Sequence, residues 1–199
     1  LTPDVSYEVL GPALLGGQIP LRDRMRPLLC VFILMMEILS LGSLISREIE
    51  QGTIQALLIT PMRVSDLFLA KGTLGIGLAF VQAVLLMALM GGLSIHPAIT
   101  LTTLLLGSIM VTGLGFLVAS FSRDMMTVTA WGMVVLIIFS IPAFGVMFPG
   151  LISDWAKIIP SFYLTDTVNR VVNYGAGWGA VEANLLILLH GNGKGGLPC

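Results

Sequence analysis

The residues of this chain that could do chemistry gather in one polar stretch between two apolar runs. Residues 47–61 read Arg-Glu-Ile-Glu-Gln-Gly-Thr-Ile-Gln-Ala-Leu-Leu-Ile-Thr-Pro. Because Glu48 and Glu50 stand where an apolar run ends, we expect their carboxylates to stay hydrated and to face water or a partner protein. Gly52 is unfavourable inside a helix and predicts a bend. Thr53 is then placed to cap a new helix.

The second half of the stretch has the pattern of a short amphipathic helix. Ile54, Leu57 and Leu58 share one apolar face, and Pro61 disfavours helical geometry at Thr60, which ends the element. The stretch therefore predicts a charged elbow followed by a helix lying on a membrane surface. The alternative is an ordinary loop whose charges are merely solvated.

Two further polar residues stand inside apolar runs. Glu37 lies at the middle of one run, where a carboxylate costs about 2.5–3.5 kcal/mol unless it is protonated, paired or wet. It should therefore face the interior of a bundle, and Gln82, near the middle of the next run, is a candidate hydrogen-bonding partner. These residues could mark a substrate path or a proton-linked site, or they could simply hold helices together.

Small residues form two stripes at helical spacing, which favours close helix packing. Lys71, just inside an apolar run, is expected to extend its ammonium group to the nearest membrane surface. The stripes consist of Gly72, Gly75, Ala79 and Ala83 and of Ser108, Thr112, Gly115 and Ala119.

The elements that must position these residues are membrane-spanning helices. Of 199 residues, 56% are hydrophobic and 11% are charged, so a bilayer is the natural solvent. The formal net charge is −1 with scattered Lys and Arg, which leaves no basic surface for nucleic acid. Neither Cys30 nor Cys199 has the spacing of a disulfide framework or a metal site.

The fold class expected is an all-α polytopic membrane protein, because each span needs about 20 apolar residues in a helix. Residues 1–27 and 190–199 are polar or rich in Gly and Pro, and residues 149–180, with aromatic anchors, are expected at the membrane surface. Lys and Arg are balanced between the two sides and do not orient the chain. Four stretches have the required length and a fifth is shorter, namely 28–46, 67–92, 100–121, 127–148 and 181–189.

Nucleotide binding and catalysis are not expected in this chain. The glycines at 72, 75 and 77 follow no strand, and the Gly-Lys pair near the C-terminus lacks the Ser or Thr of a phosphate loop. No Ser, His and acid set falls at one membrane depth, so an intramembrane enzyme is disfavoured. We therefore expect no catalytic, metal-binding or cofactor-binding residues.

The polar stretch resembles the signature that follows the second span of ABC-2 type permeases. The residues that carry this likeness are Arg47, Glu48, Glu50, Gly52, Thr53, Leu57, Leu58, Thr60 and Pro61, continuing to Lys71-Gly72. Pro160, Tyr163 and Arg170 resemble the Pro, Tyr and Arg that precede the family's last span. The likeness covers residues from about 27 to 189.

The resemblance implies a half-transporter whose residues 47–61 dock on a cytoplasmic ABC ATPase, with ATP and Mg bound by that partner. A second permease half, of the same or a related chain, would complete the pathway in a prokaryotic plasma (inner) membrane. Residues 47–66 would lie inside. Residues 149–180 would lie outside, as would residues 1–27, which form the end of an extracytoplasmic segment. The chain is expected to be a fragment that lacks the first span of the family and has a shortened last span.

One rival function follows from the residues themselves. An ion-coupled secondary transporter would place its essential carboxylate at the bilayer midplane, where Glu37 stands. The sequence leaves the transported substrate open.

Overall fold

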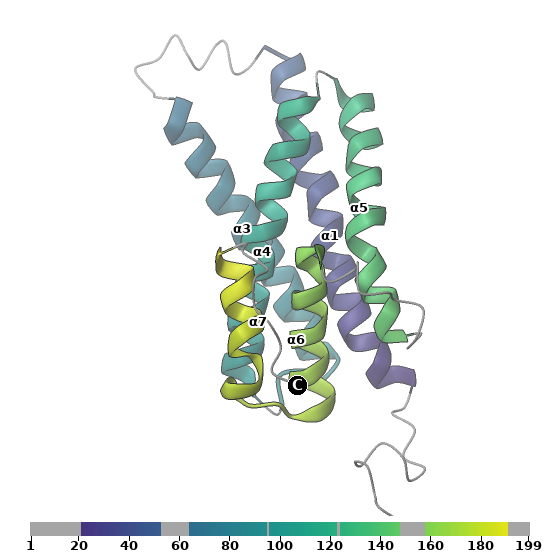
Figure 1. The fold of residues 1–199 in the computed structure, drawn as a ribbon. Coiled ribbons are helices and arrows are strands. Elements are labelled where there is room, and N and C mark those ends of the chain that lie inside the picture. The colour runs from purple at the N-terminus through teal and green to yellow at the C-terminus, as the bar shows by residue number, and fades with distance from the viewer. Residues whose placement is uncertain (1–20, 53–63, 95, 123, 148–157, 191–199) are drawn as a thin grey trace, which may run out of the picture.

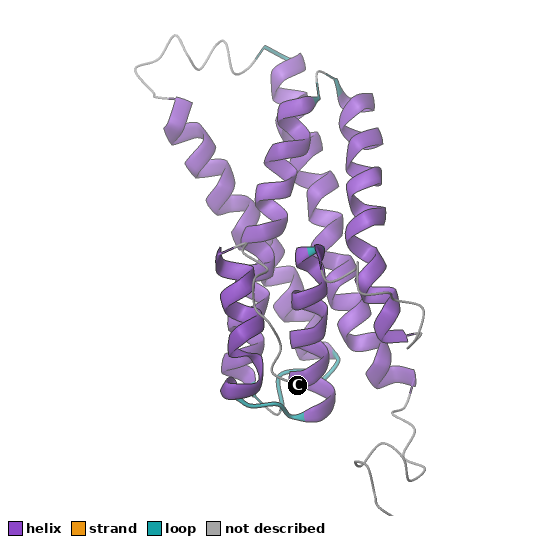
Figure 2. Ribbon diagram, viewed as in Figure 1, coloured by secondary structure: helices purple, strands orange, loops and turns teal. Residues whose placement is uncertain are grey.

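The described part of the protein is built from helices alone. The structure, a computed structural model, describes residues 21–52, 64–94, 96–122, 124–147 and 158–190. Within these ranges there are helices and connecting loops but no strand, which confirms the all-α fold (Figure 2). The helices are α1 (Leu21–Glu50), α3 (Val64–Leu89), α4 (Pro97–Phe121), α5 (Met125–Met147), α6 (Pro160–Tyr174) and α7 (Trp178–His190).

Four of these helices are long and apolar enough to cross a membrane, as the sequence predicted. Their candidate spans are Met25–Glu48, Ser65–Leu89, Pro97–Phe121 and Met125–Gly145. The main difference from expectation is the length of α1, which continues past residue 46 through Glu50 and begins before Pro27. Pro27 removes one backbone hydrogen bond but does not stop the helix.

Local sequence fixes where several helices start and stop. Pro97 and Pro160 occupy the first turns of α4 and α6, where the missing backbone N–H costs nothing. At the end of α6, Gly175 adopts a left-handed φ of 62° and Ala176 donates its N–H to the Arg170 carbonyl at 3.0 Å. This cap turns the chain sharply from α6 into α7.

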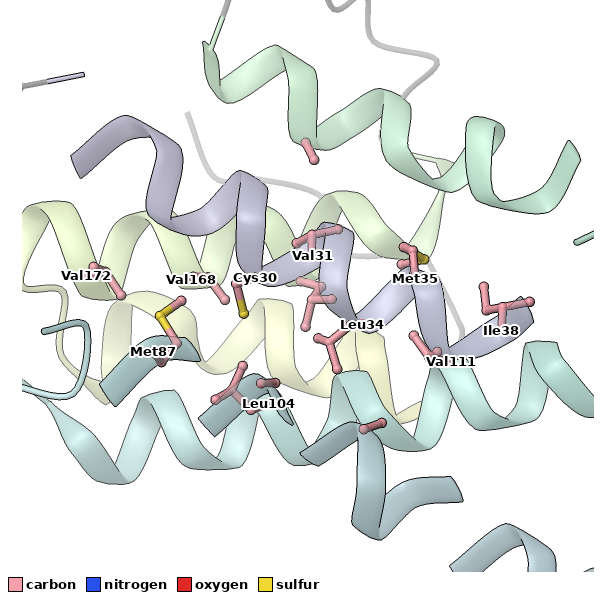
Figure 3. Packing of buried hydrophobic residues seen from close by; sticks show 14 of the residues in the cluster. Cys30, Val31, Leu34, Met35, Ile38, Met87, Leu104, Val111, Val168 and Val172 are labelled. Atoms are coloured by element: carbon pink, nitrogen blue, oxygen red, sulfur yellow. The ribbon is translucent and has the colours of Figure 1, made fainter. Parts of the chain in front are cut away.

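Helix α1 forms the centre of the bundle. It contacts α3, α4, α5 and α6, and Figure 1 shows it running among them. Figure 3 shows side chains of α1 meeting those of α3, α4 and α6 in one apolar core. Its fully buried members include Cys30, Val31, Leu34, Met35, Ile38, Met87, Leu104 and Val111.

Both small-residue stripes lie at helix contacts, which confirms packing as their role. A Cβ added to Gly75 would lie 3.1 Å from Leu41 of α1, and one added to Gly115 would also lie 3.1 Å from Leu41. A Cβ on Gly107 would lie 2.9 Å from Leu164 and 3.1 Å from Leu34. Helices α3 and α4 thus approach α1 closely, and α4 approaches α6 closely, where a side chain is missing.

Within residues 158–180, helix α6 packs against the bundle, a contact that the sequence did not predict. Helix α6 buries one face, including Leu164, Val168 and Val172, against α1, α4 and α5. The Ser161 hydroxyl donates a hydrogen bond to the Phe139 carbonyl of α5 at 2.6 Å. Figure 1 shows α6 and α7 side by side along the half of the bundle where α1 begins.

The physical reason for this packing is the strong amphipathicity of α6. Small and branched side chains gather on one side of the helix, while Asp166, Asn169 and Arg170 lie on the other. A surface position would leave the apolar side without a partner in the protein. With 13 residues, α7 is too short to cross a bilayer by itself, as expected for the last apolar stretch.

Candidate coupling site at the end of helix α1

The polar stretch begins as the last turn of α1 rather than as a separate loop. Arg47, Glu48 and Glu50 are helical, and the Arg47 carbonyl accepts the Gln51 N–H at 2.9 Å. Gly52 then adopts a φ of +67°. Such a left-handed conformation is strained for residues with a Cβ, so the bend predicted at Gly52 is confirmed.

The second half of the stretch lies outside the described residues. The predicted amphipathic helix and its cap therefore stay predictions. They concern Thr53, Leu57, Leu58, Thr60 and Pro61.

The carboxylate of Glu48 forms an ion pair with the ammonium group of Lys71 on α3. The two side chains are only 27% and 13% exposed. Glu48 is therefore less exposed than expected, and the ammonium group of Lys71 has a partner that the sequence did not predict. A partly buried pair lowers the cost of bringing either charge close to the apolar interior, which explains why Lys71 turns toward α1.

The carboxylate of Glu50 reaches the start of α5. Its Oε1 accepts the backbone N–H of Met125 at 2.7 Å. The first N–H groups of a helix lack partners within that helix and carry partial positive charge, so a carboxylate there is favourable. Glu50 is exposed, as expected, but it holds a second helix as well as facing water.

A second acid completes the start of α5. Asp124 accepts the Thr127 N–H at 2.9 Å and so caps the helix. Hydrogen bonds from the side chain and backbone of Thr127 hold the pKa of the Asp124 carboxyl below its ordinary value. The carboxylates of Glu50 and Asp124 thus both accept backbone N–H groups in the first turn of α5.

The structure does not bring together the two polar residues of the apolar runs. Glu37 is only 4% exposed, which confirms that it faces the interior. It lies between Leu34 and Leu41, which contact α4, and helical spacing places it on the same face of α1. Gln82 instead lies on an exposed face of α3, so the proposed hydrogen bond between them is wrong.

A second polar cluster joins α6 to α7. The Asp166 carboxylate accepts the Arg170 Nε–H at 2.7 Å and the Asn184 side-chain N–H at 2.8 Å. Sequence reasoning had noted Arg170 but missed Asp166 and Asn184. The spacing of Asp166 and Arg170 by four residues was the available signal.

The described residues contain no group of three or more His, Cys, Asp and Glu side chains that could hold a metal ion. The polar contacts at the end of α1 instead join this helix to α3 and α5. This arrangement is suited to carrying displacement between helices.

Comparison with known proteins identifies a family for most of the chain. Residues 24–190 match the family model described as ABC-2 family transporter protein. No curated protein and no solved structure matches the chain. The matched residues include all four candidate spans together with α6 and α7. The chain is therefore an integral membrane protein that belongs to the ABC-2 transporter family.

Proposed function

We propose that this protein is the permease subunit of an ATP-driven ABC-2 type export system and that residues 47–61 couple it to a separate ATPase. The observation that carries this proposal is the end of α1. There a charged turn contacts α3 and α5 and then bends at Gly52 toward the rest of the polar stretch. A push on that stretch would act on three helices at once.

The transport cycle follows from this connection. ATP and Mg bind the partner subunit, and nucleotide-driven closure displaces residues 47–61. Helix α1 then moves relative to its neighbours, which tilts the spans between inward-open and outward-open or occluded states. A second permease half, of the same or a related chain, completes the pathway within the lipids of a prokaryotic plasma (inner) membrane.

The proposed orientation places the end of α1 and the starts of α3 and α5 in the cytoplasm. The turn between α6 and α7 then lies on the outer side, because α6 and α7 occupy the half of the bundle where α1 begins (Figure 1). This orientation is the one in which residues 47–61 can reach a cytoplasmic ATPase.

The test compares two substitutions at the bend. Leucine strains a left-handed φ, whereas asparagine tolerates it better than other residues with a side chain. Among the described residues, no atom lies within 4 Å of the position of a Cβ at Gly52, so both substitutions act mainly through the backbone conformation. Gly52→Leu should therefore misdirect the polar stretch at normal membrane levels, whereas Gly52→Asn should couple nearly normally.

The measurements are recovery of the co-purifying ATPase and its activity in the complex. Loss of ATPase stimulation in Gly52→Leu but not in Gly52→Asn is the expected result. Equal, full activity in both variants would contradict the coupling role of the bend. ATP hydrolysis by the purified chain alone, or transport driven by an ion gradient without any ATPase, would overturn the proposed function.

A further inference from the structure

Helix α3 packs closely against α1 and α4 at Gly75, nearly halfway along its length. Leu41 and Thr112 lie within 3.3 Å of the position that a Cβ on Gly75 would take. One turn earlier, the Phe116 ring lies 3.4 Å from the corresponding position on Gly72 and meets the Phe68 ring in a tilted arrangement, with centroids 5.6 Å apart. Toward Val64, α3 diverges from the other helices (Figure 1).

This geometry makes the inner end of α3 a lever. Val64 and Gly75 are eleven residues apart, which corresponds to about 16 Å at the rise of an α-helix. Lys71 stands on this arm, one turn from Gly75, and its ammonium group pairs with Glu48 at the end of α1. A displacement of Glu48 therefore acts on the arm close to its pivot, where a small movement is amplified toward Val64.

The contact of Glu50 with α5 lies on the opposite side of α1 from the ion pair between Glu48 and Lys71. Glu48 and Glu50 are two residues apart, so their side chains leave the helix about 200° apart around its axis. Their partners match this divergence, because Lys71 is on α3 and the Met125 N–H begins α5. The carboxylates of Glu48 and Glu50 thus contact helices on opposite sides of α1.

We propose that Glu48 and Glu50 form a two-armed tie that transmits movement of the coupling segment, Glu48 to α3 through Lys71 and Glu50 to α5 through the Met125 N–H. This inference rests on the proposed function and names the residues that carry its motion. Glu48, Glu50 and Lys71 are positioning residues, since they act through the helices that they hold.

Glu48 forms an ion pair, whereas Glu50 accepts a hydrogen bond from a backbone N–H. Different substitutions therefore remove or keep each contact. Glutamine carries no charge, so Glu48→Gln removes the ion pair with Lys71 and leaves only a hydrogen bond to the amide oxygen in its place. At the other arm, a glutamine side-chain oxygen can still accept the Met125 N–H, so Glu50→Gln should keep the contact and Glu50→Ala should lose it. Glu48→Lys combined with Lys71→Glu restores the ion pair with its charges exchanged.

The experiment uses the complex with its co-purifying ATPase in lipid nanodiscs, with Cys30 and Cys199 replaced by alanine. Spin labels at Ser65→Cys and Met126→Cys report the distance between the inner ends of α3 and α5. That distance is measured without nucleotide and after trapping with ATP and vanadate. ATPase activity of each complex is measured in parallel.

When Glu48, Glu50 and Lys71 are unchanged, the distance between the two spin labels should shift on nucleotide trapping. Glu48→Gln and Glu50→Ala should retain the bound ATPase but lose most of this shift. Their ATPase coupling should fall about fivefold or more, the lower end of typical coupling between sites. Glu50→Gln and the charge-exchanged pair should behave nearly as the protein with the unchanged tie.

Shifts of unchanged size in both Glu48→Gln and Glu50→Ala would overturn the tie. Equal loss in Glu50→Gln and Glu50→Ala would overturn the arm to α5. If Glu48→Gln fails to reach the membrane, the charge-exchanged pair decides, since its failure to couple would overturn the arm to α3. If no ATPase co-purifies with the protein in which Glu48, Glu50 and Lys71 are unchanged, the proposed function itself would be refuted.

Discussion

The meeting point of α1, α4 and α6 gives a prediction whose size follows from the structure. A Cβ on Gly107 would lie 2.9 Å from Leu164 Cδ1 and 3.1 Å from Leu34 Cδ1, and both leucines are fully buried. Because neither side chain can swing into open space, Gly107→Ala should cost about 1–3 kcal/mol from overpacking. The better helix propensity of alanine offsets about 1 kcal/mol of that cost.

The matched control lies on the same helix. Gly113 is exposed, and no atom lies within 4 Å of the position of its Cβ. Gly113→Ala should therefore stabilise α4 by about 1 kcal/mol, so the two variants should differ by about 1–3 kcal/mol. Reversible unfolding in mixed micelles measures this difference. Adding Leu164→Val to Gly107→Ala should recover part of the loss, because it removes the closest atom.

The result that would refute this reasoning is an equal change in stability for Gly107→Ala and Gly113→Ala. Such a result would show that α6 does not press against α4 at this point. A loss in Gly107→Ala that Leu164→Val fails to reduce would place the strain elsewhere.

Three further predictions test orientation, helix contacts and pH dependence. Ser65→Cys should react with a membrane-impermeant maleimide only from the cytoplasm and Gly177→Cys only from outside, and reversed labelling would refute the orientation. Ser161→Ala should lower stability by about 1 kcal/mol in thermal unfolding, because it removes the hydrogen bond to the Phe139 carbonyl; an unchanged midpoint would show that this bond adds nothing. The depressed pKa of Asp124 means that its stabilising contribution is complete above the ordinary value of 3.8 and is lost as pH falls through the lower folded value. Asp124→Asn keeps the cap without the charge, so its stability should fall less between about pH 6 and pH 3 than that of the unchanged protein. Equal losses in thermal unfolding would contradict this assignment.

The parts of the fold that sequence predicted are those set by local physical chemistry. Four spans could be identified because a bilayer demands a long apolar run in each helix. The bend at Gly52 and the packing of Gly75 and Gly115 followed from the lack of a side chain. The buried position of Glu37 followed from the cost of exposing a carboxylate to lipid.

The parts that sequence did not predict depend on distant partners. Glu50 and Met125 are separated by 75 residues, and a backbone N–H leaves no mark in a sequence. Lys71 could equally have extended to the surface, since only the position of α1 offers it Glu48. The packing of α6 was missed because anchoring aromatic residues suggested a surface position, whereas its apolar face required a partner.

Helix α1 links the candidate coupling site to the rest of the bundle. Its inner end holds α3 and α5 through Glu48 and Glu50, and Leu34 in its outer half meets Leu164 of α6 over Gly107. Glu37 lies between these contacts, about 20 Å from Glu50 along the helix axis. If α1 moves as a rigid helix, as proposed, the movement would shift Glu37 relative to α4 and Leu34 relative to α6. The same displacement would therefore reach both the buried carboxylate and the outer helical hairpin.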